Sequence, residues 1–184
     1  AAALFAFAGS AFAAPVTYKL DPGHTNVLAS WNHFGYSNPS INFGQVDGTL
    51  VYDADQVSAS SVQVTLPLTG LSALADQFYD HLTSDKWFDA AKYPTATFTS
   101  TGVTVAGEGK LAVAGDLSIH GVTKPVVMDV TINKVGEHPM SKKPAAGFDA
   151  SFDIKRSEFG VGGYAPAVSD EVTIEVTVEA QAAK

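Results

Sequence analysis

The chain has 184 residues, 46% of them hydrophobic, which is enough for one domain with a buried core, and no internal linker divides it. Its formal net charge of −8 argues against a nucleic-acid-binding protein, because a phosphate-binding face needs clustered lysine and arginine. The absence of cysteine excludes disulfide bonds, thiolate metal sites and cysteine nucleophiles.

The first predicted element is a targeting segment. The chain opens with an apolar run that ends in a small-x-small triplet, Ala11–Ala13, which is typical of a signal peptide, here without its charged front. Cleavage after this triplet would leave a mature chain that starts at Ala14. We therefore expect residues 1–13 to be a truncated signal peptide, residues 14–184 to form a single domain, and the protein to be exported to the periplasm. A buried N-terminal helix is the alternative interpretation, since the run is too short to span a bilayer.

Along the rest of the chain the dominant pattern is alternation of apolar and polar residues, which predicts β-strands with one buried face. The clearest case lies near the end, where the apolar residues from Val172 to Val178 alternate with threonines and glutamates. Short gaps with turn residues, such as Gly107–Gly109, predict that the strands are mostly antiparallel. We expect about eight strands from the candidate runs, of which the first is the weakest: Thr17–Leu20, Asn26–His33, Gly44–Tyr52, Ser61–Leu68, Thr95–Val105, Lys110–Ile119, 126–133, Phe148–Ile154 and 170–180.

One segment breaks this alternation and predicts a helix. Between Leu71 and Ala91 apolar residues recur at helical spacing, at positions 71, 74, 78 and 82. Ser84 is suited to cap a second, shorter helical turn that runs through Trp87, and Pro94 prevents any continuation. We therefore expect one helical insertion near Leu71–Ala91.

Antiparallel strands with one apolar face can close into a barrel or split into a sandwich, and periodicity alone does not choose. A barrel of about eight strands has an interior just wide enough for side chains or one small ligand, and a helix at one mouth would shield it. We therefore favour an all-β, lipocalin-like antiparallel barrel with one helical insertion. An outer-membrane barrel would show the same alternation with its apolar residues toward lipid, but the candidate strands lack paired aromatic girdles.

The stretch GDLSIHGVTKPVVMDV, Gly115–Val130, raises the question whether His120 is catalytic. A general base needs a partner that orients it and a pocket that shifts its pKa, and the local sequence shows neither. Gly121 readily adopts positive φ, while Pro125 lacks an amide donor and belongs at a strand start or an edge. We interpret His120 as part of a turn.

Four stretches of the chain together carry a family resemblance: YKLDPGHTNVLASWNHFG, HLTSDKWFDAAKYPTATFTST, GDLSIHGVTKPVVMDV and IKRSEFGVGGYAPAVSDEVTIEVTVEA. With these stretches the chain resembles the YceI-like family over essentially its whole mature length. The resemblance implies export in bacteria, an extended lipocalin-like barrel, and binding of polyisoprenoids, including isoprenoid quinones, in the barrel lumen. The chain departs from the family where Phe78 and Tyr79 replace a usual Arg-Asp pair, and where NPSINFGQ, residues 38–45, is longer than the usual connection.

The ligand-binding residues are expected on the inward faces of the strands and on the helical insertion. His33 shares a strand face with Val27, Ala29 and Trp31, so it is a candidate polar group among apolar walls, with a hydrogen bond to local backbone as the alternative. The aromatic candidates line either the lumen or the remaining core; they are Trp31, Phe43, Phe78, Trp87, Phe88, Phe98, Phe148 and Phe152. The predicted lumen residues are Val27, Ala29, Trp31, His33, Phe78, Leu82, Trp87, Phe98, Met128, Phe148 and Phe152.

No catalytic, metal or cofactor site is predicted. The histidines do not stand at the short ligand spacing of a known metal motif. Asp21 and His24 suggest a catalytic pair, but no nucleophile motif such as Gly-x-Ser-x-Gly accompanies them, and Asp21-Pro22-Gly23 is interpreted as a turn. We therefore expect no cofactor and no enzymatic activity.

These observations favour a protein that binds or carries a long apolar lipid, which the family resemblance specifies as a polyisoprenoid or an isoprenoid quinone. One alternative is a periplasmic enzyme that uses His24 or His33, which needs a second titratable group within hydrogen-bond reach inside a cleft. Another is an interaction module for a membrane redox partner, which would show an exposed apolar patch. The expected partner is the isoprenoid lipid and not nucleic acid; transient contact with a membrane or a membrane redox protein, and a homodimer, are further candidates.

Overall fold

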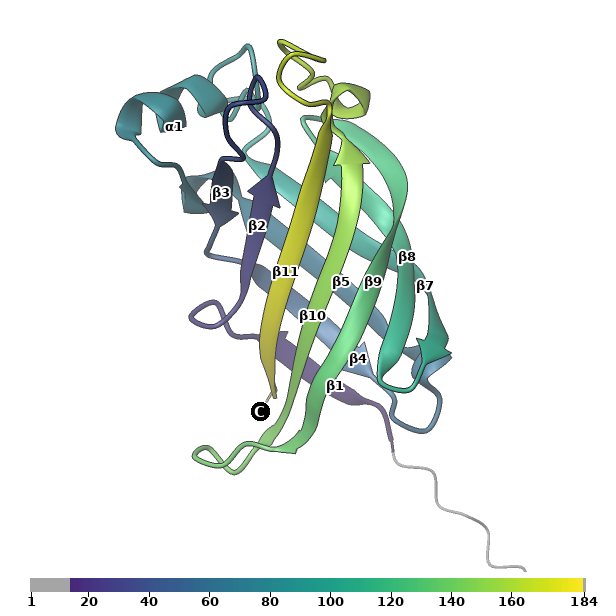
Figure 1. Cartoon of the computed structure of the whole chain (residues 1–184). Helices are drawn as coiled ribbons and strands as arrows, with labels where there is room; N and C mark the ends of the chain where they lie inside the picture. Colours follow the sequence, from purple (N-terminus) through teal and green to yellow (C-terminus); the bar gives the residue numbers. More distant parts are fainter. Residues whose placement is uncertain (1–13, 184) are drawn as a thin grey trace, which may run out of the picture.

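The computed structural model describes residues 14–183, so the predicted signal peptide, residues 1–13, lies outside the described residues. Within this range the chain forms a strongly curved antiparallel sheet with one α-helix beside it (Figure 1). The elements are β1 (Val16–Leu20), β2 (Asn26–Ser30), β3 (Ser40–Phe43), β4 (Asp47–Tyr52), η1 (Val57–Ala59), β5 (Ser61–Pro67), η2 (Leu68–Gly70), β6 (Leu71–Ser72), α1 (Asp76–Thr83), β7 (Thr95–Gly107), β8 (Lys110–Ile119), β9 (Val122–Glu137), β10 (Pro144–Lys155), η3 (Arg156–Phe159) and β11 (Glu171–Ala182).

Eight of the described strands close into a ring. Their order around the barrel is β1-β4-β5-β7-β8-β9-β10-β11, and β1 completes the ring by pairing with β11, where Tyr18 lies opposite Ala182. The neighbours in this ring run antiparallel. The prediction of an all-β, antiparallel, lipocalin-like barrel of about eight strands is therefore confirmed.

The strands β2, β3 and β6 extend the barrel wall at one end. β11 pairs with β2 through residues 173–177 and with β1 through residues 180–182, so β1 and β2 are consecutive pieces of one wall segment. In the same way β3 pairs with β2, and β6 pairs with β3. This end of the barrel, with α1 beside it, is the upper end in Figure 1.

The structure corrects two predicted boundaries in this region. The stretch 38–45, interpreted as a long connection, contains the strand β3, and β4 begins at Asp47 rather than at Gly44. Ile41 and Phe43 are buried and lie opposite residues of β2. A strand of four residues has only two inward positions, so its alternation does not stand out from the neighbouring asparagine, proline and glycine.

The helical insertion is present but shorter than predicted. The helix α1 covers Asp76–Thr83. Leu71 lies in β6, where it pairs with Phe43 of β3, and Leu74 is 79% exposed in the connection between β6 and α1. The helical spacing therefore holds for positions 78 and 82 but is wrong for positions 71 and 74. Pairing with β3 overrides the local pattern at Leu71, and Leu74 precedes the start of α1 at Asp76.

Ser84 ends α1 instead of starting another helix. Its hydroxyl donates to the carbonyl oxygen of His81 at 2.7 Å. The chain then makes a hydrogen-bonded turn, in which the Trp87 N–H donates to the Ser84 carbonyl at 3.1 Å. Among residues 14–183 no helix is long and apolar enough to cross a membrane.

The two faces of the barrel wall differ in chemistry, as β10 illustrates. Phe148 and Phe152 face the lumen, while the Asp149 and Asp153 carboxylates lie on the outer face and accept hydrogen bonds from threonine hydroxyls of β11 at 2.8 and 2.7 Å. In β10 the aromatic residues therefore point inward and the acidic residues outward. This is the reverse of the arrangement expected for an outer-membrane barrel.

His120 and Gly121 form the two-residue turn that joins β8 to β9. Both have positive φ, 53° and 74°, as a type I′ hairpin turn requires. Pro125 lies opposite Asp116 of β8, while the pairing of β9 with β10 begins only at Asp129. Pro125, which lacks an amide donor, therefore lies where β9 pairs with β8 alone and its other side is a sheet edge, so both the turn and the edge position are confirmed.

Candidate ligand-binding site

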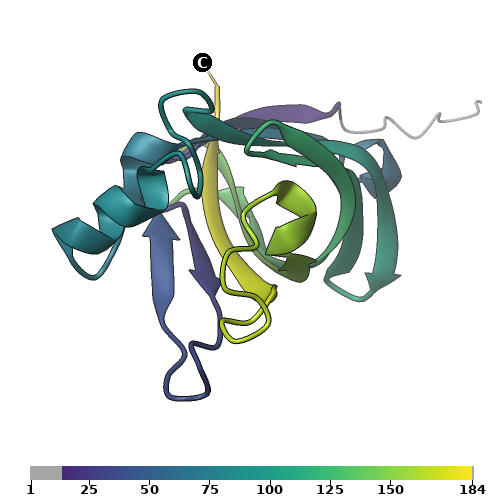
Figure 2. The same ribbon diagram turned by 90° about the horizontal axis from the view of Figure 1, so that it is seen from above.

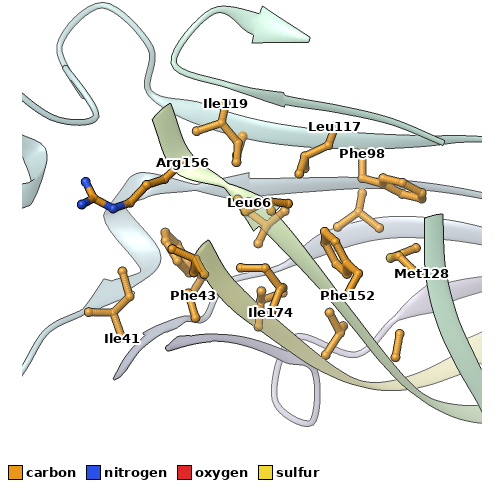
Figure 3. Close-up of a pocket in the computed structure, with 18 of the residues that line it drawn as sticks. Ile41, Phe43, Leu66, Phe98, Leu117, Ile119, Met128, Phe152, Arg156 and Ile174 are labelled. Carbon is orange, nitrogen blue, oxygen red and sulfur yellow. The ribbon is translucent and has the colours of Figure 1, made fainter. Parts of the chain in front are cut away.

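The barrel encloses a cavity of about 600 Å³. Figure 3 shows side chains of different strands gathered around this space, among them Phe98 of β7, Leu117 of β8, Phe152 of β10 and Ile174 of β11. Each occupies an inward position of its strand, because side chains alternate between the two faces. The volume falls within the range of sites for small organic ligands, and the wall is mostly apolar.

All of the predicted lumen residues lie along this cavity. Most of the strand residues among them follow from alternation, and the residues after Leu71 that lie outside strands come from α1 and the turn that follows it. Trp31 and His33 were predicted in a strand that runs to His33, but β2 ends at Ser30, so both lie in the connection that follows β2. That they contact a ligand stays a prediction. They are Val27, Ala29, Trp31, His33, Phe78, Leu82, Trp87, Phe98, Met128, Phe148 and Phe152.

Sequence reasoning missed further residues of the wall. Ile41 lines the cavity from β3, a strand that was not predicted. Phe43 of β3 and Phe88 were aromatic candidates for the lumen or the core; both line the cavity, and their rings pack edge-on with centres 6.2 Å apart. Leu117 and Ile174 also line it, and the alternation that identified Phe98 and Phe148 in other strands could have identified them. Of the two β3 residues, Phe43 was indicated only by its aromatic ring, and Ile41 had no usable signal in the sequence.

Aromatic side chains surround the upper part of the cavity. The rings of Trp31 and Phe78 lie 6.1 Å apart, and those of His81 and Trp87 lie 5.2 Å apart. The contact of Phe78 with Trp31 joins the helix α1 to the residue that follows β2. These rings extend the apolar wall toward the mouth.

Gly115 of β8 provides space for the ring of Phe98 in the wall. A β-carbon at this position would overlap the Phe98 ring and come within 2.6 Å of the carbonyl oxygen of Thr99. Glycine therefore lets the ring lie against the backbone of β8, where any larger residue would push it into the cavity.

The segment from η3 to the start of β11, residues 156–170, folds over the mouth of the barrel. In the view from above, η3 stands in the opening of the ring (Figure 2). Phe159 and Val161 of this segment are buried, and Val161 lines the cavity. The Nδ1 atom of His120 lies 3.3 Å from the carbonyl oxygen of Phe159, so the β8–β9 turn contacts the covering segment. We call residues 156–170 the mouth segment.

Arg156 is a charged residue in this apolar surrounding, with only 7% of its surface exposed. Its Nε donates to the Ser169 carbonyl at 2.8 Å, its Nη1 to the Val161 carbonyl at 2.7 Å and its Nη2 to the Val168 carbonyl at 2.8 Å. The guanidinium carbon lies 5.5 Å from the centre of the Trp87 ring, within the range of a cation–π contact. Burial lowers the pKa of Arg156 from its ordinary value. Arg156 thus links Val161, which follows η3, to Val168 and Ser169, which precede β11.

His33 lies at the mouth, next to the cavity. Its ring packs edge-on against Phe34 with centres 4.6 Å apart, and its backbone N–H donates to the Ser37 carbonyl at 2.8 Å. The prediction that His33 faces the lumen is correct in position, although the residue is exposed rather than enclosed. Its ring contacts an aromatic neighbour, which does not provide the second titratable group that an enzymatic role requires.

His24 lies in the turn between β1 and β2, outside the lumen. Its Nδ1 is 2.9 Å from Oδ2 of Asp21, whose Oδ1 accepts the Gly23 N–H at 2.9 Å, so the predicted turn is confirmed. The hydrogen bond to Asp21 raises the pKa of His24, and the same bond lowers the pKa of Asp21. The imidazole is 68% exposed, and its side-chain partners are the carboxylates of Asp21 and Glu179. In the described part of the chain no group of three metal-ligating side chains is placed to hold a metal ion.

Residues 18–180 match the family model of the YceI-like domain. The chain belongs to the YceI-like domain family. Protein YceI of Escherichia coli O6:H1 is 36% identical over 178 residues, which cover 97% of this chain and 92% of that protein. The family match therefore spans the barrel from β1 to β11, and the resemblance found in the sequence is confirmed.

Solved structures share this fold. BcnA of Burkholderia cenocepacia superposes with a TM-score of 0.79 at 27% identity, covering 87% of this chain and 98% of that chain. A polyisoprenoid binding domain from Saccharophagus degradans, implicated in plant cell wall breakdown, superposes with a TM-score of 0.68 at 14% identity, covering 91% of this chain and 99% of that one. At that identity the second likeness shows a common fold.

Proposed function

We propose that this protein binds and carries a long apolar lipid, a polyisoprenoid or an isoprenoid quinone, in the lumen of the barrel. The observation that carries the proposal is the cavity of about 600 Å³, whose wall offers a ligand mostly carbon atoms. Such a wall favours hydrocarbon, because apolar surface is driven out of water into an apolar site. The polyisoprenoid binding domain from Saccharophagus degradans has the same fold, which supports an isoprenoid among the apolar lipids.

Burial of the lipid tail supplies the affinity. Each methylene group that leaves water contributes roughly 0.8 kcal/mol, so a few isoprene units offset the association cost of about 4–15 kcal/mol. Strands of about ten residues, rising ~3.3 Å per residue and tilted by ~40°, give a lumen on the order of 25 Å high. Tail length beyond that height should add little affinity.

The geometry supports binding rather than catalysis. The titratable pair with catalytic spacing, Asp21 and His24, lies in a solvent-exposed turn outside the lumen. The polar groups at the mouth are instead engaged in holding the chain: Arg156 donates to three backbone carbonyls, and His120 contacts the Phe159 carbonyl.

We further propose that the protein works in the periplasm after removal of residues 1–13. The support is the small-x-small triplet Ala11–Ala13 at the end of the apolar run. The intact mass of protein isolated from the periplasm is expected to match a chain that starts at Ala14. A mass that includes residues 1–13 would contradict the export proposal.

The binding proposal is tested by filling the lumen. Ala150 lines the cavity, while its neighbour Ser151 is exposed on the outer face. We expect Ala150→Trp to weaken binding of a fluorescent isoprenoid analogue at least tenfold, because the indole occupies ligand space, and Ser151→Trp to leave binding unchanged. Native mass spectrometry with lipid extraction, on protein purified from its own host, identifies the lipid that is carried.

Two results would overturn the proposal. Equal binding by the Ala150→Trp and Ser151→Trp variants, both folded, would show that the analogue does not enter the lumen. Purified protein that carries no lipid and does not bind the analogue would remove the carrier function altogether.

A further inference from the structure

Two loops at the mouth of the barrel contain no Asp, Glu, Lys or Arg. They are residues 32–39, between β2 and β3, and residues 159–169 of the mouth segment. The chain as a whole has a net charge of −8, and the β9–β10 loop at the other end of the barrel carries Lys142 and Lys143. The uncharged surface is confined to these two loops, because at the same end of the barrel α1 carries Asp76 and Asp80 and η3 carries Glu158.

Hydrogen bonds join these two loops into one surface. The Phe34 N–H donates to the Ala167 carbonyl at 3.1 Å, and the Ser169 N–H donates to the Asn32 carbonyl at 2.9 Å. His33 also forms an isolated β-bridge with Val168. Segments about 130 residues apart in sequence thus form a single uncharged surface, which we call the tip.

The tip exposes aromatic side chains. Tyr36 is 93% exposed, Tyr164 is 67% exposed and Phe34 is 49% exposed. Phe34 and Tyr164 also line the cavity, so the apolar surface of the lumen continues onto the outside of the molecule. Tyrosine and tryptophan favour the interface of a bilayer, where one part of the ring contacts apolar groups and the other stays wet.

We propose that the tip docks on the surface of a lipid bilayer with no net charge, and that the carried lipid passes there between the membrane and the lumen. The inference rests on the proposed lipid carriage, because it identifies the bilayer as the place where the cargo is exchanged. The absence of charge in the tip fits zwitterionic head groups, while the net charge of −8 opposes an anionic surface. The continuity of the aromatic surface with the lumen gives the lipid an apolar path.

The first test measures docking without cargo. The full chain is sedimented with vesicles of phosphatidylcholine and phosphatidylethanolamine that contain no isoprenoid. Tyr36 does not line the cavity, so Tyr36→Asp adds a charge to the tip and leaves the lumen intact. We expect Tyr36→Asp to reduce vesicle binding at least tenfold. Met140→Asp, which adds the same charge at an 87% exposed residue at the opposite end of the barrel, is the matched control and should bind vesicles as the wild type does.

A gain-of-signal variant tests insertion directly. Tyr36→Trp places an indole at the most exposed position of the tip, and its fluorescence should shift to shorter wavelength when neutral vesicles are added. Three results would overturn the docking proposal. The first is equal vesicle binding by Tyr36→Asp and the wild type, and the second is a preference of the wild type for vesicles with anionic phosphatidylglycerol. The third is failure of the wild type to bind any vesicle. A protein dimer that Tyr36→Asp dissociates would overturn it as well, because the occupant of the tip would then be a second copy of the chain.

Failure of docking and failure of carriage are separable. Binding of an isoprenoid analogue in solution, without vesicles, should be the same for Tyr36→Asp and for the wild type. If neither the wild type nor Tyr36→Asp binds the analogue, but the wild type binds neutral vesicles and Tyr36→Asp does not, the carrier function is wrong and docking stands. If both bind the analogue and neither binds vesicles, carriage stands and docking is wrong.

Discussion

At the level of single residues, neighbouring positions of one strand have opposite environments. Phe152 lines the cavity, and Asp153 accepts a hydrogen bond from the Thr173 hydroxyl on the outer face. We expect Phe152→Asp to place an unpaired carboxylate in the apolar lumen, lowering the free energy of unfolding by about 3 kcal/mol and weakening binding of an isoprenoid analogue more than tenfold. Chemical unfolding and fluorescence titration measure the two effects.

The matched control for Phe152 is its neighbour. Asp153→Asn keeps an acceptor for Thr173 and stays in water, so stability should change by less than about 0.5 kcal/mol and lipid binding should not change. Normal binding by Phe152→Asp, or an equal loss in both variants, would mean that the side of the strand does not decide binding.

A second residue-level prediction concerns the exposed pair of Asp21 and His24. The raised pKa of His24 means that its contribution to stability is present below the usual value of 6.5 and is lost as pH rises through the folded-state pKa. The lowered pKa of Asp21 means that its contribution is present above the usual 3.8 and is lost as pH falls through the folded-state pKa. The pair therefore acts mainly between these two values. NMR titration should give His24 a pKa above 6.5 that falls in Asp21→Asn; an unchanged pKa in that variant would contradict the pairing.

At the level of elements, the mouth segment depends on one side chain. Arg156 supplies donors to the carbonyls of Val161, Val168 and Ser169, and its removal leaves buried carbonyls without partners. We expect Arg156→Met to cost about 2–4 kcal/mol of stability and to speed amide hydrogen exchange in residues 157–169.

The neighbouring Lys155 is exposed and serves as the control for Arg156. Lys155→Met should leave both stability and exchange close to those of the wild type. If Arg156→Met protects residues 157–169 as well as the wild type does, the segment is held by its own packing and not by the guanidinium.

The whole molecule should be more stable when its lumen is filled. A ligand that binds only the folded state at a hundred times its dissociation constant adds about 2.7 kcal/mol, which raises Tm by roughly 5–10 °C for a domain of this size. Thermal unfolding of delipidated protein, with and without an isoprenoid alcohol, measures the shift. A Tm that does not depend on the lipid would count against binding in the lumen.

Much of the barrel could be predicted because alternation is a local property. Phe148 and Phe152 take one face of β10 wherever the strand is placed, and the same rule assigned Val27, Ala29 and Phe98 to the lumen. The short strand β3 was missed, and Leu71 was assigned to a helix, because in both cases pairing with a neighbouring strand decided the conformation. Local pattern does not contain that information.

The sequence by itself determined which residues face inward, where the β8–β9 turn lies and that the strands run antiparallel, because side-chain periodicity and turn chemistry act over a few residues. Only the tertiary structure decided how the wall divides between β1 and β2 along β11, how Arg156 becomes buried by the mouth segment, and how residues 32–39 meet residues 159–169 to form the tip. These contacts join segments far apart in the chain, and they exist because closing the barrel brings the ends of its strands together around one mouth.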